Sequence, residues 1–440
     1  MRQSLMLFIS IITISLGFSQ ENPSSFTLQE AIDYALENSR QAKNATRDID
    51  AAVKQKWETI ATGLPQINGQ ISYVNNLERQ FPGIDFNNDG IEDIGAKQNM
   101  TPSVTLNQLI FDGSYIVGLQ SAKVFLEISE NAKIKTDLEV RKSVINAYGN
   151  VLLAEESIKV LERNISVLEK NLDEITKIYE NGLEEEESVE QLQITLSGVK
   201  SNLNNTTRLK DLAYQMLNIT LGLDINNNTL LSDSLETLAI SNLDLNILDA
   251  SSDVQNTIDY KIASNDKVSK ELLVKLEQSR ILPTISGFLT GSYVGNNDKF
   301  RFFSSNQAWA GTAAMGFNID IPIFGSGLKS ARTQRAKINL EKSEDDLTET
   351  EQRLKLQIAS AKSDFEFSIE DYENKQENLA LAERIETKNQ TKFFEGIGSS
   401  FELRQAQTQL YAAQQELLQA MLDVINSKAE LETVLNTPIN

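Results

Sequence analysis

The chain has 440 residues, of which 62 are acidic and 41 basic, and its net charge of −21 argues against nucleic acid as a partner. It contains no cysteine and no histidine, which excludes thiolate nucleophiles, imidazole bases and Cys/His metal sites. Carboxylate, lysine, tyrosine or serine chemistry remains, but no grouping of such residues indicates a hydrolase. We therefore predict no enzymatic activity, no cofactor and no metal site.

Residues 1–19 are predicted to be a secretory signal peptide. Arg2 provides the positive start, residues 5–16 form a short apolar core, and small residues flank the expected cleavage point at Ser19. The apolar core is shorter than the roughly 20 residues of a membrane-spanning helix. No later segment is long and apolar enough to span a bilayer as a helix, so a mature protein that enters a membrane must do so as a closed barrel.

Two segments about 214 residues apart follow the same order of short helix, strand, loop, strand and long helical hairpin. The shared landmarks are Leu64-Pro65 and Leu282-Pro283, Ile110-Phe111 and Ile323-Phe324, and Gly182 and Gly396. We predict a first repeat at residues 20–222, an equatorial collar at 223–253 and a second repeat at 254–440.

Each repeat contains two runs in which apolar and polar residues alternate, which predicts strands at 66–76, 102–111, 284–294 and 311–322. In the clearest run Met315, Phe317 and Ile319 alternate with Gly316, Asn318 and Asp320, whereas Phe288 interrupts the alternation of the third strand. Runs of about ten residues with one apolar face fit a transmembrane barrel. A soluble sandwich has a similar pattern but usually needs about seven strands.

Four strands cannot close a barrel, and an open edge in lipid leaves backbone groups unpaired. Other copies of the chain must therefore complete the sheet. Closure alone allows two copies with eight strands or three copies with twelve.

The loop between the first two strands contains a segment, Asp85 to Gly90, that begins like a calcium-binding loop. The glutamate required at the twelfth position is replaced by Ala96. This favours a turn-rich loop in solvent over a calcium site.

Each repeat also contains a long helical hairpin. Residues 112–180 lack proline, and apolar residues near their end step 3-4-3-4 over four heptads, which predicts a coiled coil in a rod of about 100 Å. The chain turns at a tip near 181–188. The second hairpin starts near 327 and turns at 395–400, and Lys375 and Asn389 interrupt its outgoing stripe. We interpret the stripes as packing surfaces.

With these features together, the sequence resembles the TolC-like outer membrane efflux proteins over essentially its whole mature length. The motifs that carry the resemblance are Phe26 to Asn38, Gly63 to Gln66, Leu109 to Gly113, Tyr179 to Leu183, Ile321 to Gly325 and Lys428 to Glu432.

The resemblance implies a mixed membrane α+β fold: a homotrimer with a twelve-stranded transmembrane β-barrel in outer membrane lipid, continued by an α-helical coiled-coil barrel in the periplasm. It implies a passive exit duct of a tripartite efflux or type I secretion system, with a periplasmic adaptor (membrane fusion) protein and an inner-membrane pump as partners. The chain has no phosphate-binding glycine loop, so the pump would supply the energy.

The resemblance also implies functional positions at the helical tips. An acid after the second tip lines the closed aperture, and Glu402 matches it; a second acid is expected one turn later, where this chain has Gln405. The expected adaptor-docking residues are Gly182, Leu183, Glu184, Glu185, Glu186 and Glu187 at the first tip, and Gly396, Ile397, Gly398 and Ser399 at the second.

The acidic run at the first tip has two interpretations. It is either a solvated turn or a concentrated charge that helps docking or gating in the trimer. For the whole chain the rival hypothesis is a structural or adhesive coiled-coil protein of the cell envelope. The polar strand faces imply low selectivity and do not identify a transported substrate.

Overall fold

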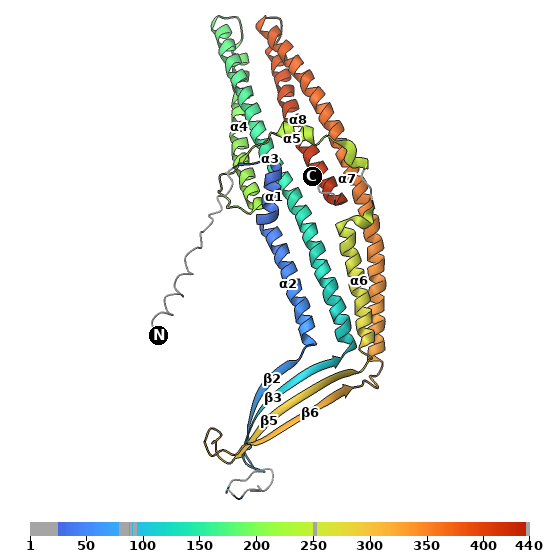
Figure 1. The fold of residues 1–440 in the computed structure, drawn as a ribbon. Helices are drawn as coiled ribbons and strands as arrows, with labels where there is room; N and C mark the ends of the chain where they lie inside the picture. Colours follow the sequence, from blue (N-terminus) through green and yellow to red (C-terminus); the bar gives the residue numbers. More distant parts are fainter. Residues whose placement is uncertain (1–24, 79–87, 89, 91–94, 250–252, 437–440) are drawn as a thin grey trace, which may run out of the picture. The chain divides into compact units, whose positions relative to one another are not determined.

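Figure 1 shows the computed structural model of the chain, which describes residues 25–78, 88, 90, 95–249 and 253–436. The predicted signal peptide and most of the segment from Asp85 to Gly90 lie outside these residues. Two compact units are formed, and each combines segments from both halves of the sequence. The first contains described residues up to 42, 139–249 and 361–433; the second contains those of 43–138, 253–360 and 434–436.

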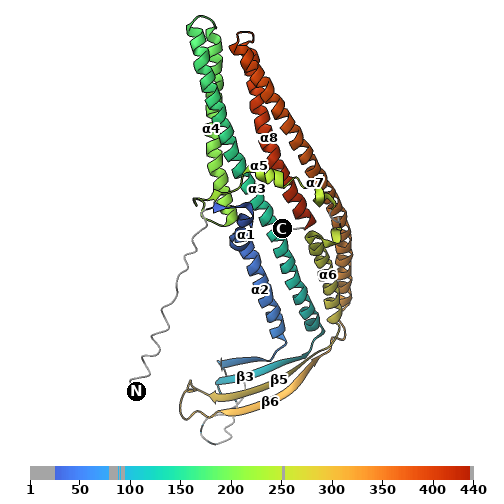
Figure 2. The same ribbon diagram turned by 45° about the horizontal axis from the view of Figure 1, so that its top comes forward.

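The second unit is built on an antiparallel sheet of four strands in the order β2-β3-β5-β6. The strands are β2 (Gln66–Asn75), β3 (Gln98–Phe111), β5 (Thr284–Asn297) and β6 (Ala310–Asp320). Figure 2 shows β3, β5 and β6 side by side. β2 and β6 are the outer strands, and within the described chain their outer edges have no partner strand.

The register of the sheet places most of the apolar residues of the four strands on one face. Ile67, Leu106, Leu289 and Met315 lie opposite one another in a single row across the sheet. The next row belongs to the other face and is more polar, and its Thr105 and Thr290 hydroxyls are 2.9 Å apart. The apolar face is open, because 84% of Met315 is exposed.

The observed strand bounds correct the predicted ones. β3 begins at Gln98, four residues before the predicted start, because the end of β5 continues to Asn297 and pairs with it. Pro102 has no N–H to donate, which makes it look like a strand boundary in the sequence. The pairing with β5 passes over it, from Met100 directly to Ser103. β6 ends at Asp320, before Ile321 and Pro322.

Phe288, which interrupts the alternation of β5, has its own role. It pairs with Gly316 on the more polar face, and a Cβ on Gly316 would lie 3.0 Å from the Phe288 ring. The glycine therefore makes room for the aromatic side chain.

Gly63 explains the first Gly-Leu-Pro motif, which joins α2 (Arg40–Thr62) to β2. A Cβ at Gly63 would lie 2.3 Å from the ring of Tyr115, so only glycine fits beside this ring. The Tyr115 hydroxyl donates to the Ile60 carbonyl at 3.1 Å, and the Gln108 amide donates to the Gly63 carbonyl at 2.8 Å. The side chains thus fix the angle at which the chain enters the sheet.

In the same unit α6 (Ile258–Ser279) bonds to both long helices, α3 (Gly113–Glu180) and α7 (Leu328–Phe394). Lys135 of α3 pairs with Asp259 of α6 at 2.7 Å, and Ser343 of α7 donates to Asp266 of α6 at 3.1 Å. None of the described helices has a stretch apolar enough and long enough to cross a membrane.

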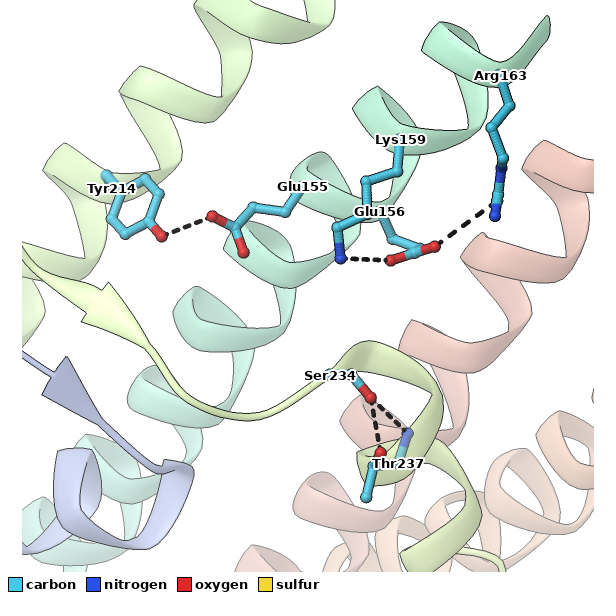
Figure 3. A network of polar contacts seen from close by, with 7 residues as sticks. All are labelled: Glu155, Glu156, Lys159, Arg163, Tyr214, Ser234 and Thr237. Atoms are coloured by element: carbon cyan, nitrogen blue, oxygen red, sulfur yellow. Dashed lines mark hydrogen bonds and ion pairs between the residues drawn. The ribbon is translucent and has the colours of Figure 1, made fainter.

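The first unit contains the parts of both hairpins that include the tips. In these parts α4 (Glu186–Leu221) returns from α3, and α8 (Ser400–Leu435) returns from α7. The buried Thr229 hydroxyl donates to the side-chain oxygen of the buried Asn218 at 2.6 Å, which joins the segment after α4 to the end of that helix. In Figure 3 the Tyr214 hydroxyl of α4 donates to Glu155 of α3 at 2.8 Å, and Glu156 accepts from Lys159 at 3.0 Å.

The segment predicted as an aperiodic collar contains short elements: β4 (Leu230–Leu231), α5 (Leu235–Ser241) and the 3-10 helix η1 (Leu245–Asp249). A second 3-10 helix, η2 (Val254–Asn256), precedes α6, and α1 (Leu28–Asn38) follows β1 (Ser25–Phe26) at the start of the described chain. β1 pairs with β4 in parallel. The Tyr148 hydroxyl lies 2.9 Å from the Asp233 carboxylate and 3.0 Å from the Phe26 carbonyl, which fastens both segments to α3.

Candidate functional site

The first tip is a tight turn closed by backbone hydrogen bonds. The Gly182 N–H donates to the Tyr179 carbonyl at 2.8 Å, and the Leu183 N–H donates to the Ile178 carbonyl at 3.1 Å. Gly182 has φ +74°, the left-handed conformation that ends many helices. The next side chain, Leu183, is 78% exposed. The turn therefore presents an apolar side chain to its surroundings.

The second tip repeats this geometry. The Gly396 N–H donates to the Phe393 carbonyl at 3.0 Å, and the Ile397 N–H donates to the Lys392 carbonyl at 2.9 Å. Gly396 has φ +75°, and Ile397 is 73% exposed. Gly398 also donates to the Lys392 carbonyl, at 3.0 Å. Both turns are Schellman motifs with an exposed aliphatic residue after the glycine.

The helices that follow the two turns begin differently. At the second tip the Ser399 Oγ accepts from the Glu402 N–H at 3.2 Å, and the Glu402 carboxylate accepts from the Ser399 N–H at 3.3 Å. This reciprocal pair is a capping box. Glu402 therefore has a structural role that the sequence interpretation missed, although Ser399-x-x-Glu402 is the signature of such a cap.

At the first tip Glu185 occupies the cap position of α4 without a side-chain cap bond. Glu184 accepts from the Ser188 hydroxyl at 2.6 Å, and Glu187 accepts from the Gln191 amide at 2.7 Å. Glu186 and Glu187 lie in the first turn of α4, where negative charge interacts favourably with the helix dipole. In the described part of the chain no lysine or arginine pairs with Glu184 to Glu187.

Beneath the tips the two hairpins pack against each other. Ile175 and Val189 of the first hairpin form a buried cluster with Phe393 and Leu403 of the second. Glu402 and Gln405, one helical turn apart, are both exposed in this chain. The two tips thus share one buried apolar cluster beneath them. The predicted aperture residues Glu402 and Gln405 lie outside this cluster and are exposed.

A buried polar layer further along the hairpins was not predicted. The Asn164 amide of α3 donates to Gln414 of α8 at 2.8 Å, and the Gln390 amide of α7 donates to Asn171 of α3 at 3.1 Å. Asn164 and Asn171 are 7% and 2% exposed, and they are one heptad apart. The spacing was visible in the sequence, beside the apolar seam.

Two acidic residues of the second hairpin are buried in this unit. Burial raises the pKa of Glu386, against the opposing effect of the neighbouring Gln407 amide. Burial also raises the pKa of Glu432 to about 7, although Arg141 and Lys428 act in the opposite direction. Arg141 is 3.8 Å from the Glu432 carboxylate. Lys375, which interrupts the predicted stripe, pairs with Glu416 of α8 at 3.1 Å.

The profile of the outer membrane efflux protein family matches residues 31–223 and 270–437. The chain belongs to this family. Membership of this family assigns the protein to efflux at the cell outer membrane. A comparison with curated protein sequences gave no match.

Solved structures of outer membrane proteins have the same fold. The Campylobacter jejuni channel CmeC is 18% identical, with a TM-score of 0.73 over 93% of this chain and 85% of its own. Vibrio cholerae VceC is 16% identical, with a TM-score of 0.73 over 93% and 95% of the two chains. The open state of Neisseria gonorrhoeae MtrE is 18% identical, with a TM-score of 0.70 over 93% and 88%.

Proposed function

We propose that the protein is a homotrimeric exit duct of a tripartite efflux or type I secretion system, with a barrel in the outer membrane and a helical tunnel in the periplasm. The observation that carries this proposal is a four-stranded sheet with two outer edges and one exposed apolar face. Three copies of four strands make a twelve-stranded barrel in which every edge is paired and the apolar face contacts lipid. The repeats at 20–222 and 254–440 belong to this proposal.

An exposed apolar stripe on α4 supports association through the helices as well. Leu209, Leu212, Met216 and Ile219 are 51%, 59%, 63% and 54% exposed, and they step 3-4-3 along the helix. Such a stripe is typical of a coiled-coil seam, and in water it favours a partner helix. A neighbouring copy in the trimer would cover it.

The tips are proposed to dock a periplasmic adaptor protein. Leu183 and Ile397 are the exposed apolar side chains, and the turn glycines hold them in place. The acidic residues Glu184 to Glu187 would attract a basic adaptor surface over a distance of about one Debye length. The inner-membrane pump beyond the adaptor supplies the energy, since the duct is passive.

The barrel is tested by a pair of substitutions in β6. Phe317 is 75% exposed on the apolar face, so Phe317→Arg should cost about 2–4 kcal/mol near the membrane midplane and reduce trimer yield. Asn318→Arg, on the opposite face, should assemble normally and change single-channel conductance. Equal assembly defects would contradict the assignment of the faces. A monodisperse monomer in mild detergent, or a trimer without conductance, would contradict the duct and favour a structural envelope protein.

The aperture is tested by a substitution that respects the capping box. Glu402→Gln keeps an oxygen to accept from Ser399 but removes the charge, so helix capping is largely retained. Three glutamates converging on the axis would bind cations. We expect weaker block by divalent cations applied from the helical end, with assembly unchanged. Unchanged block in Glu402→Gln, combined with loss of block after neutralising Glu184 to Glu187, would place the gate at the first tip.

A further inference from the structure

The loop between β5 and β6 carries an aromatic cluster that has no role in the barrel closure, helix association or tip docking proposed above. Tyr73 of β2 contacts the rings of Phe300 and Phe302, with centroids 5.6 and 6.0 Å away and edge-to-face geometry. Phe303 lies 5.9 Å from Phe300, and Trp309 lies 6.2 Å from Phe302. Phe302 is buried at the centre, whereas Phe300 and Phe303 are 56% and 84% exposed.

This cluster continues the apolar face of the sheet. Tyr73 pairs with Met100, which pairs with Gly295, so the three lie in one row of that face. A Cβ at Gly295 would lie 3.0 Å from the Trp309 ring, so the indole covers this row. The start of β5 is connected to α6 and the end of β6 is connected to α7. The loop between β5 and β6 joins the opposite ends of these two strands. The aromatic cluster therefore lies at the end of the apolar face that is remote from the helix connections (Figure 1).

Two basic residues alternate with the aromatic ones in this loop. Lys299 and Arg301 are exposed on either side of Phe300, in a protein whose net charge is −21. In the described part of the chain neither forms an ion pair with an acidic side chain. The Ser304 N–H donates to the Arg301 carbonyl at 2.9 Å, and the Lys97 N–H donates to Asp298 at 3.2 Å, so the loop has a defined conformation.

We propose that this loop binds the phosphorylated headgroup of a lipid in the outer leaflet of the outer membrane, an inference that rests on the proposed barrel. Aromatic side chains at the end of a lipid-facing surface lie at the level of the headgroups. Lys299 and Arg301, whose charged ends extend on long aliphatic stems, reach the phosphates from there. The cluster thus anchors the barrel to anionic lipid at a fixed depth.

Trp309 provides a direct measurement of this binding. The chain has two tryptophans, and the other one, Trp57, is an exposed residue of α2. A Trp57→Phe protein therefore reports only on the cluster. The trimer in an uncharged detergent is titrated with lipid A, with lipid A stripped of its phosphates, and with inorganic phosphate. We expect a saturable change in Trp309 emission with intact lipid A alone.

The double variant Lys299→Gln/Arg301→Gln should weaken this binding about thirtyfold, because it removes the free energy of attraction of two basic residues to the anionic headgroup. The matched control Arg384→Gln/Lys388→Gln removes the same charges from an exposed stretch of α7 and should bind like the parent. Emission before titration verifies that the cluster is folded.

Several outcomes would overturn the proposal: no response to lipid A, equal binding by the double variant, equal binding of dephosphorylated lipid, or equal competition by inorganic phosphate. An increase in particle mass that the double variant abolishes would instead identify a second trimer as the occupant. Mass and conductance of the parent protein are measured in parallel. A parent protein that does not have the mass of a trimer, or that does not conduct, would contradict the proposed duct independently of the lipid titration.

Discussion

The two helical hairpins use the same turn but place their carboxylates differently. At the first tip Glu184 to Glu187 are gathered around the turn, and none of them forms an ion pair with a described lysine or arginine. In the second hairpin the tip acid Glu402 is engaged in a capping box, and Glu386 and Glu432 are buried in the helices. The turn geometry is thus a constraint of the architecture, whereas the position of charge is free to differ. We expect the first hairpin to respond to salt and the second to pH.

The largest expected effect concerns Glu432. Its pKa is raised from 4.5 to about 7, so the folded protein binds a proton that the unfolded chain releases. This contribution to stability is complete below pH 4.5 and is lost as the pH rises through 7, by about 3 kcal/mol in total. Glu432→Gln should flatten the dependence of urea unfolding on pH between 5 and 8.

The neighbouring Glu430, which is half-exposed and pairs with Lys142, provides the control for this prediction. Glu430→Gln should leave the pH dependence as in the parent. Equal slopes in all three proteins would remove the asserted difference between the hairpins.

The second prediction tests the shared turn. Gly182 and Gly396 have positive φ and open space where a Cβ would lie, so alanine meets backbone strain but no clash. Each substitution should cost about 1–2 kcal/mol, and the two costs should be similar. Hydrogen exchange of the tip amides measures them. Gly198→Ala, in the middle of α4 with equally open space, should instead stabilise its helix by up to about 1 kcal/mol.

The third prediction separates the two caps. Ser399→Ala removes a cap oxygen that accepts a backbone N–H and should destabilise the start of α8 by about 1 kcal/mol. Glu185→Ala, at the equivalent position of α4, removes no cap bond and should change the start of α4 by only a few tenths of that amount. Comparable losses of protection at both tips would mean that the caps do not differ in strength.

Much of this arrangement could be predicted from the sequence. The alternation through Met315, Phe317 and Ile319 identifies the apolar face because side chains alternate along any strand. It does not identify the partner of each strand, so the start of β3 before Pro102 was missed. The turns follow from glycine where a helical period ends, but the exposure of Leu183 depends on the packing beneath it.

The capping box could be recognised in the sequence as Ser399-x-x-Glu402. Because of the resemblance to known channels, Glu402 was interpreted as an aperture residue only. The burial of Glu386 and Glu432 could not be predicted. It arises where helices distant in sequence meet, and a glutamate in a helix otherwise indicates a solvated position.

The smallest expected effect is the general field of the first tip. Replacing Glu184 to Glu187 with glutamine removes exposed charges whose interactions are screened within about 8 Å at physiological ionic strength. Cation selectivity in single-channel recordings should fall slightly in low salt and be unchanged in high salt. An effect that persists at high salt would mean that these carboxylates bind ions or a partner at close range.

The pairing of β3 with β5 also determines the order in which the chain can fold. Thr105 and Thr290 touch across the sheet although 185 residues separate them in sequence. The long helices between them form from contacts that are local, whereas this strand pair must first close a very large loop. The helices should therefore form early and the centre of the sheet late. A chain in which this pair has not yet formed would hold β2–β3 and β5–β6 as separate hairpins with hydrophobic side chains in water, and such exposed surface promotes aggregation.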